Sequence, residues 1–228
     1  MGALAVGRMS EKVLQRKLVW WWVLVGSLSV LIFIGQETSD EPPPDTLYQY
    51  TTALLNIPYY LLLLSLVLLI AVGLDRREAF ALKRPESWRR AGLLAVGVFV
   101  AMWITAAALE QLLRAGEEQG LDPRQITSGD VPPFLLSALV IAVLGPSVEE
   151  LTFRGLGFYL LSQFGDLAAI VVTSFAFALA HGIVAGIPVF FVIGAALAFV
   201  RSRTGSIYPA MLMHGSFNAI QLIGGAAT

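Results

Sequence analysis

Long apolar runs constrain this chain more than any other feature of its sequence. A helix needs about 20 mostly apolar residues to cross the hydrocarbon core of a bilayer. Runs that reach or approach this length lie at residues 18–35, 54–74, 91–109, 134–164, 167–183, 187–200 and 207–224. Charged residues make up only 14% of the 228 residues, whereas a soluble domain has about 25%. The sequence therefore predicts an all-α fold, a polytopic transmembrane helical bundle of about seven spans.

The composition also excludes several functional classes. With 15 basic and 16 acidic residues the formal net charge is −1, so no basic excess points to nucleic acid as a partner. The chain has no cysteine, which excludes disulfides, thiolate metal sites and a cysteine nucleophile.

The segments between the runs alternate in charge. Residues 1–17 carry four basic residues and one acidic, and residues 75–90 carry six basic and three acidic. Residues 36–50 carry four acidic residues and no basic one, and residues 110–132 carry five acidic and two basic. By the positive-inside rule, this alternation predicts an integral, multi-pass membrane protein with a cytoplasmic N-terminus.

The run at 134–164 is long enough for one bent crossing or for two, with Gly145-Pro146 as the interruption. Arg201 and Arg203 are cytoplasmic if it crosses once and face outward if it crosses twice. We favour one crossing, which gives seven spans.

The first run begins with Trp20, Trp21 and Trp22, side chains that suit the membrane interface. No small-x-small cleavage site follows the run, so we expect an uncleaved helix rather than a signal peptide.

Few ionisable residues lie in the apolar second half of the chain. From residue 131 onward they are Glu149, Glu150, Arg154, Asp166, His181, Arg201, Arg203 and His214. An ionisable group at the centre of a membrane helix costs at least a few kcal/mol, so it is tolerated where it is paired or faces a wet cavity. Glu150 and Arg154 are four apart and can pair on one helix face, which leaves Glu149 free to face a cavity. Alternatively, Ser147 caps a helix whose first turn carries both glutamates.

The two histidines of the chain also lie in apolar segments. His181 ends the stretch that begins at Phe177, and alone it would be interpreted as a satisfied core residue. His214 and Asn218 are four apart on one helix face, and alone they would be a polar contact between helices. One bundle that holds all of these groups together with Glu149 is better explained by a single site.

These side chains suggest water-activated hydrolysis. Glu149 is the candidate general base, and His181 can hold or polarise the same water. His214 and Asn218 can donate hydrogen bonds to a developing oxyanion. The same atoms permit a zinc site with Glu149, His181 and His214 as ligands and water in the open position, and sequence spacing does not distinguish the two. No His-Glu-x-x-His or Gly-x-Ser-x-Gly motif occurs, and residues 131–228 contain a single aspartate, so zincin-like, serine and aspartyl chemistries are disfavoured.

Three short motifs occur in a fixed order: Glu149-Glu150-x-x-x-Arg154, Phe177-x-x-x-His181 and His214-x-x-x-Asn218. In this order they resemble the CPBP family of intramembrane proteases (CAAX protease and bacteriocin-processing, or Abi), which includes the type II CAAX prenyl endopeptidases. The resemblance covers about residues 131–225. We therefore interpret 131–228 as the catalytic transmembrane core and 1–130 as N-terminal transmembrane helices with flanking loops, within one continuous membrane domain.

The resemblance implies an intramembrane endopeptidase that cuts near the C-terminus of a membrane-associated or prenylated-type substrate, at a site opening toward the cytoplasmic side. By carry-over, Glu149 and His181 would activate the water. His214 and Asn218 would stabilise the oxyanion. The residues expected to support the site without acting are Glu150, Arg154 and Phe177.

The family has been described both as metalloproteases and as glutamate-dependent proteases. No cofactor is therefore assigned, zinc being the metal if one is required. Asn218 favours the glutamate mechanism, because an amide suits an oxyanion donor better than a zinc ligand. The expected partners are membrane lipid and a peptide or lipidated-protein substrate, and the sequence does not indicate an oligomeric state.

Two other functional classes remain open at this point. One is a non-catalytic membrane scaffold or bacteriocin-immunity protein, because family members are linked to self-immunity. The other is a proton-coupled transporter, because intramembrane Glu and His chains also carry protons. The first half of the chain has no interior charged groups to line such a path, which counts against the transporter.

Overall fold

A computed structural model describes residues 11–38, 45–114, 127 and 129–227 of the chain. Every regular element in these ranges is helical, so the all-α prediction is confirmed. The long helices outside the fourth apolar run are α1 (Glu11–Thr38), α2 (Tyr50–Ile70), α4 (Trp88–Leu113), α9 (Asp166–Leu179), α10 (Ile187–Thr204) and α11 (Tyr208–Ala227). Short helices lie at η1 (Thr46–Tyr48) and α3 (Arg76–Ala79).

Five of the helices in the described ranges are long and apolar enough to cross a membrane, and the protein is an integral membrane protein. The fourth of the five is a helix of 34 residues, Val131–Phe164, here called the long helix. The predicted stretches 167–183 and 207–224 correspond to α9, with 14 residues, and α11, with 20. The expectation of about seven spans is roughly consistent with this arrangement.

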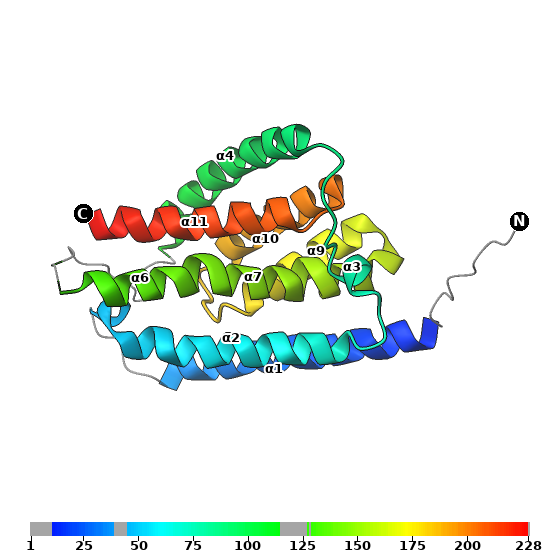
Figure 1. Cartoon of the computed structure of the whole chain (residues 1–228), viewed down its shortest axis with the longest axis horizontal. Coiled ribbons are helices and arrows are strands. Elements are labelled where there is room, and N and C mark those ends of the chain that lie inside the picture. Colours follow the sequence, from blue (N-terminus) through cyan, green and yellow to red (C-terminus); the bar gives the residue numbers. More distant parts are fainter. Residues whose placement is uncertain (1–10, 39–44, 115–126, 128, 228) are drawn as a thin grey trace, which may run out of the picture.

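Successive helices run back and forth along the bundle, with α4 at an angle to the rest (Figure 1). The end of α10, which carries Arg201 and Arg203, lies at the same end of the bundle as α3 (Figure 1). The backbone N–H of Ile207 donates to the Ala81 carbonyl at 3.1 Å, which ties the segment after α10 to the loop after α3. If the long helix crosses once, the ends of α3 and α10 must lie on the same side of the bundle, as they do here. Parts of the acidic segments 36–50 and 110–132 lie outside the described residues.

The expected interruption at Gly145-Pro146 is wrong, because the long helix continues through it. Its pieces are α6 (Val131–Leu139), η2 (Val140–Leu144), α7 (Gly145–Glu150), η3 (Leu151–Gly157), α8 (Phe158–Leu161) and η4 (Ser162–Phe164). η2 and η3 are π-helical, and the Gly145 N–H donates to the Val140 carbonyl five residues back. The Ser147 hydroxyl donates to the Val143 carbonyl at 2.6 Å inside this helix, so Ser147 is not a helix cap.

Trp21 anchors α1 to the long helix. Its side chain is fully buried, and its indole N–H donates to the Thr152 carbonyl at 2.9 Å. Gly157 provides the space, because a Cβ there would lie 2.5 Å from the indole. Trp20 and Trp22 are exposed, as expected at a lipid interface. The interface prediction for Trp21 is wrong, since its N–H satisfies a carbonyl in the core.

Candidate active site

Glu150 lies at the centre of a buried polar network. Both Glu150 and Arg154 are 0% exposed, and Arg154 Nη1 donates to Glu150 Oε1 at 3.0 Å, which confirms the predicted pair. Arg154 Nη2 donates to the Gly194 carbonyl on α10 at 3.0 Å. His214 Nδ1 on α11 lies 3.0 Å from the same Glu150 oxygen. One carboxylate therefore neutralises the guanidinium and orients an imidazole from another helix.

Glu149 occupies a different environment from its neighbour. Its side chain is 19% exposed, and its Oε2 lies 3.8 Å from His214 Nε2. The Tyr60 hydroxyl on α2 donates to its Oε1 at 3.1 Å. Both contacts come from other helices and hold the carboxylate in one orientation. Its partial exposure leaves it accessible to water.

His181 lies in the turn after α9, where the helix ends. Its Nδ1 lies 2.8 Å from the Phe177 carbonyl, so the Nδ1–H donates to this oxygen and Nε2 keeps a free lone pair. The imidazole stacks on Phe190, with ring centroids 3.9 Å apart and planes at 21°. These contacts fix the tautomer and the ring plane together.

Phe177 is the packing centre of the site. Its ring centroid lies 4.5 Å from that of His181 and 5.7 Å from that of His214. The Arg154 guanidinium carbon lies 4.3 Å from the same ring. The buried Phe177 ring therefore contacts one residue from each of the three predicted motifs.

His214 and Asn218 both reach the long helix from α11. The Asn218 amide nitrogen donates to the Ile141 carbonyl at 2.9 Å. In an α-helix this carbonyl would accept from the Gly145 N–H, but that N–H reaches back to Val140 in the π-helical segment. The following residue is Pro146, which has no backbone N–H to donate. The π segment and the proline thus leave one carbonyl free for Asn218.

The three candidate zinc ligands are Glu149, His181 and His214. Glu149 and His214 are neighbours, and the Phe177 ring packs against both His181 and His214. No group of three His, Cys, Asp or Glu side chains in the described ranges is arranged to hold a metal ion.

Tyr60 is a site residue that the sequence analysis missed. It lies 89 positions before Glu149, outside every motif. The local sequence offered little signal, because Tyr59 and Tyr60 are two of several polar side chains in this mostly apolar run. Gly145 makes the approach possible, because a Cβ there would lie 2.8 Å from the Tyr60 hydroxyl oxygen.

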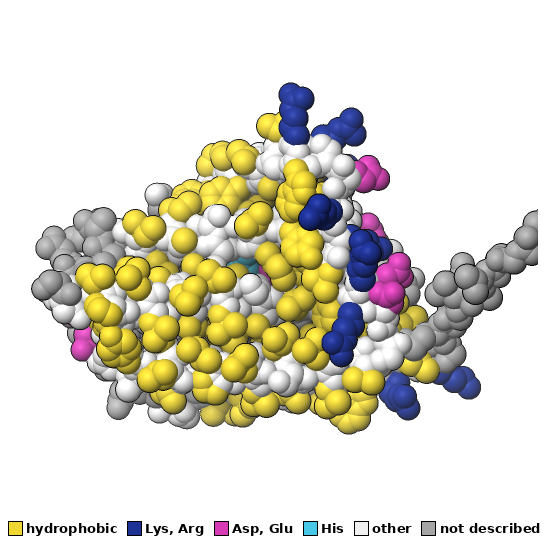
Figure 2. Space-filling view, viewed as in Figure 1, with side chains coloured by type: hydrophobic (Ala, Val, Ile, Leu, Met, Phe, Trp, Pro, Cys, Tyr) yellow, Lys and Arg dark blue, Asp and Glu magenta, His cyan; other side chains and the backbone are white. Residues whose placement is uncertain are grey.

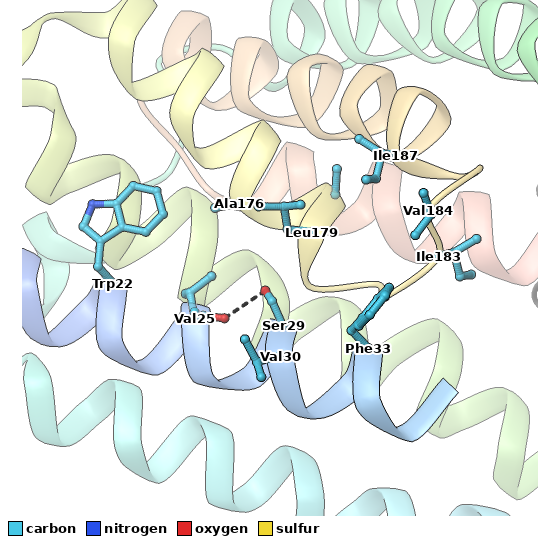
Figure 3. Close-up of a pocket in the computed structure, with 13 residues that line it drawn as sticks. Trp22, Val25, Ser29, Val30, Phe33, Ala176, Leu179, Ile183, Val184 and Ile187 are labelled. Atoms are coloured by element: carbon cyan, nitrogen blue, oxygen red, sulfur yellow. Dashed lines mark hydrogen bonds between the residues drawn. The ribbon is translucent and has the colours of Figure 1, made fainter. Parts of the chain in front are cut away.

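An apolar groove of about 370 Å³ lies between α1 and the turn that carries His181. Figure 3 shows Val25, Ser29 and Phe33 of α1 facing side chains of α9 and of the turn. The Ser29 hydroxyl donates to the Val25 carbonyl at 2.9 Å, so this hydroxyl is satisfied within α1. Gly182 and Ile183, directly after His181, belong to the lining. The groove therefore reaches the edge of the candidate site.

The fold and the site together define a polytopic helical membrane protein with a buried Glu–His centre. Residues 131–220 match the family model of the type II CAAX prenyl endopeptidase Rce1-like domain. The match covers all three motifs, so their resemblance to a CAAX protease family is confirmed for this part of the chain. No curated protein and no solved structure matches the chain.

Proposed function

We propose that this protein is an intramembrane endopeptidase that hydrolyses a peptide bond near the C-terminus of a membrane-associated or prenylated-type substrate. The observation that carries the proposal is the difference in burial and pairing between two adjacent carboxylates. Glu150 is buried and paired with Arg154, whereas Glu149 is partly exposed beside His214 Nε2. A structural pair needs only the first carboxylate, and the second has the exposure and the neighbours of a general base.

In the proposed reaction, Glu149 takes a proton from a water that His181 Nε2 also holds. The hydroxide forms a bond to the carbonyl carbon, and the carbonyl electron pair moves to oxygen. When this intermediate collapses, the C–N bond breaks and the protonated Glu149 passes its proton to the leaving amine. The products are a carboxylic acid, which then loses its proton to solvent, and an amine, and the base is restored.

His214 and Asn218 are the proposed oxyanion donors. An amide nitrogen has two N–H donors, and the Ile141 carbonyl accepts one from Asn218, which leaves the other. Because Nδ1 of His214 donates to Glu150, Nε2 is the atom turned to the reacting side. In the proposed mechanism Nε2 donates to the oxyanion from the imidazolium form of His214, which carries a proton on each ring nitrogen. Both donors are held before substrate arrives, so little reorganisation is needed.

We propose that the reaction needs no metal, which the arrangement of Glu149, His181 and His214 supports. The test uses purified protein in liposomes with a prenylated peptide, and mass spectrometry of the products. A product shortened at its C-terminus is expected, and it should form equally with a chelator present. An intact peptide would contradict the proposed activity. Loss of cleavage on chelation and its return with zinc would contradict the metal-free mechanism alone.

We propose that the end of the bundle with α3 faces the cytoplasm. Figure 2 shows Lys and Arg side chains gathered at this end, beyond a body covered by apolar side chains. His214 follows the start of α11 by six residues, or about 9 Å of helix. The site would then open toward the cytoplasmic side, and the N-terminus would be cytoplasmic.

Tyr60→Phe is expected to lower kcat about tenfold and to leave KM unchanged. The substitution removes the donor to Glu149 Oε1, and one hydrogen bond to a charged group contributes about 1.5 kcal/mol. Steady-state cleavage rates measure the effect, with the thermal midpoint as a folding control. Tyr50→Phe, at the exposed start of α2, is the matched variant. A rise in KM at constant kcat would show that Tyr60 contacts substrate instead of positioning Glu149.

We propose that the groove beside His181 holds the apolar part of the substrate. Gly26→Leu fills the groove without a backbone clash, because nothing lies within 4 Å of a Cβ built there. KM for a prenylated peptide should rise about tenfold, the loss expected when roughly two buried CH₂ groups are displaced. Gly35→Leu is the control, being on the same helix, equally open and outside the groove. An unchanged KM in Gly26→Leu would place the apolar part elsewhere.

A further inference from the structure

A second pocket lies at the cationic end of the bundle, away from the groove. It has a volume of about 730 Å³ between the α3–α4 connection and the start of α11. Its lining residues are Arg77, Leu82, Lys83, Arg84, Trp88, Tyr208, Met211 and Leu212. Nothing in the proposed reaction uses this pocket.

The polar part of the lining is entirely cationic or aromatic. Arg77, Lys83 and Arg84 contribute three positive charges, and no carboxylate belongs to the lining. Lys83 has a partner in Glu78 at 3.4 Å, but the two side chains are 46% and 61% exposed, so this pair is weak and exchangeable. The pocket therefore favours an anion.

The remainder of the lining is apolar and open to the surroundings. Leu212 is 65% exposed and Trp88 is 50% exposed. The cations at this end adjoin the apolar surface of the bundle (Figure 2), and Trp and Tyr are the side chains enriched where hydrocarbon meets headgroups. A free phosphate would contact only the cationic part of the lining, whereas an amphiphile would contact both the cationic and the apolar part.

We propose that this pocket binds an anionic phospholipid, with its phosphate at Arg77, Lys83 and Arg84 and its acyl chains along Leu212. Basic pockets between transmembrane helices on the cytoplasmic side bind anionic headgroups in this way. Met211 precedes His214 by one helical turn, so the bound lipid packs against the helix that supplies the candidate oxyanion donor. The proposal does not depend on the peptidase activity.

The test measures lipid binding to the full chain by native mass spectrometry, with phosphatidylglycerol as the anionic probe and phosphatidylcholine as the neutral one. Wild type should bind phosphatidylglycerol at least tenfold more tightly than phosphatidylcholine. The triple variant Arg77→Ala, Lys83→Ala and Arg84→Ala should lose this preference, because each cation near a lipid surface contributes about a fivefold gain in affinity.

The matched control is the triple variant Arg76→Ala, Arg89→Ala and Arg90→Ala. It removes the same charge from exposed positions at the same end and outside the pocket, and it should keep the preference. Equal losses in the two triple variants would overturn the proposal in favour of general surface attraction. Displacement of the lipid by glycerol phosphate at similar concentrations would overturn it in favour of a soluble phosphate. The single variant Leu212→Glu, which leaves all cations in place, should also weaken phosphatidylglycerol binding, and unchanged binding would contradict the acyl-chain placement.

Discussion

Glu149→Gln is expected to slow peptide cleavage by about 10²–10⁴-fold, the usual contribution of a general base. Glutamine keeps the size of the side chain and can still accept from the Tyr60 hydroxyl, but it cannot take a proton from water. The buried pair of Glu150 and Arg154 is untouched, so the fold should survive. Initial rates of product release from a prenylated peptide in liposomes measure the loss.

Glu86→Gln is the control for this experiment. Glu86 is an exposed carboxylate in the segment before α4, so its replacement removes the same charge without touching the site, and cleavage should stay at the wild-type rate. Wild-type cleavage by the Glu149→Gln protein would remove Glu149 from the mechanism. A wild-type protein that binds the peptide without cutting it would instead support a binding scaffold.

The parts of the fold that follow from local chemistry could be predicted from the sequence. Apolar runs locate the helices, because a bilayer-sized stretch without charge has few other stable forms. The pair of Glu150 and Arg154 also follows from local spacing, since residues four apart share a helix face. The same rule places His214 and Asn218 on one face of α11, and both contact the long helix.

The contacts that the sequence could not predict join distant segments. Tyr60 reaches Glu149 across 89 positions, and Trp21 reaches Thr152 across 131. Neither residue differs locally from an ordinary aromatic side chain in an apolar run. Their partners become evident only from the space left by Gly145 and Gly157.

The continuity of the long helix is the clearest case in which a local rule fails. Proline removes a donor and usually ends or kinks a helix, so an interruption at Gly145-Pro146 was the reasonable expectation. Here the unpaired Ile141 carbonyl finds a donor in Asn218, and the π-helical segment absorbs the missing bond. Such π segments are frequent at functional sites, and this one holds a proposed oxyanion donor in place.

Arg154→Ala should lower the free energy of unfolding by about 3–5 kcal/mol, because it breaks a fully buried ion pair and leaves the Glu150 carboxylate without its guanidinium partner. It also removes the donor to the Gly194 carbonyl and the contact with Phe177. Denaturant unfolding in detergent micelles, followed by tryptophan fluorescence, measures the loss. Arg203→Ala, at an exposed position of α10, should change the free energy of unfolding by less than about 1 kcal/mol.

A double variant separates the charge from the packing. If the loss in Arg154→Ala comes from an uncompensated carboxylate, then adding Glu150→Gln should restore part of the stability, because replacing both partners of a buried pair is far less costly than removing one. His214 can still donate from Nδ1 to the glutamine oxygen, so the link from α11 to the long helix is preserved. Alternatively, the double variant could be less stable than Arg154→Ala, with the two losses simply adding. Additive losses would show that the ion pair itself does not stabilise this site. Glu150 and Arg154 would then act through separate contacts, Arg154 through Gly194 and Phe177 and Glu150 through His214.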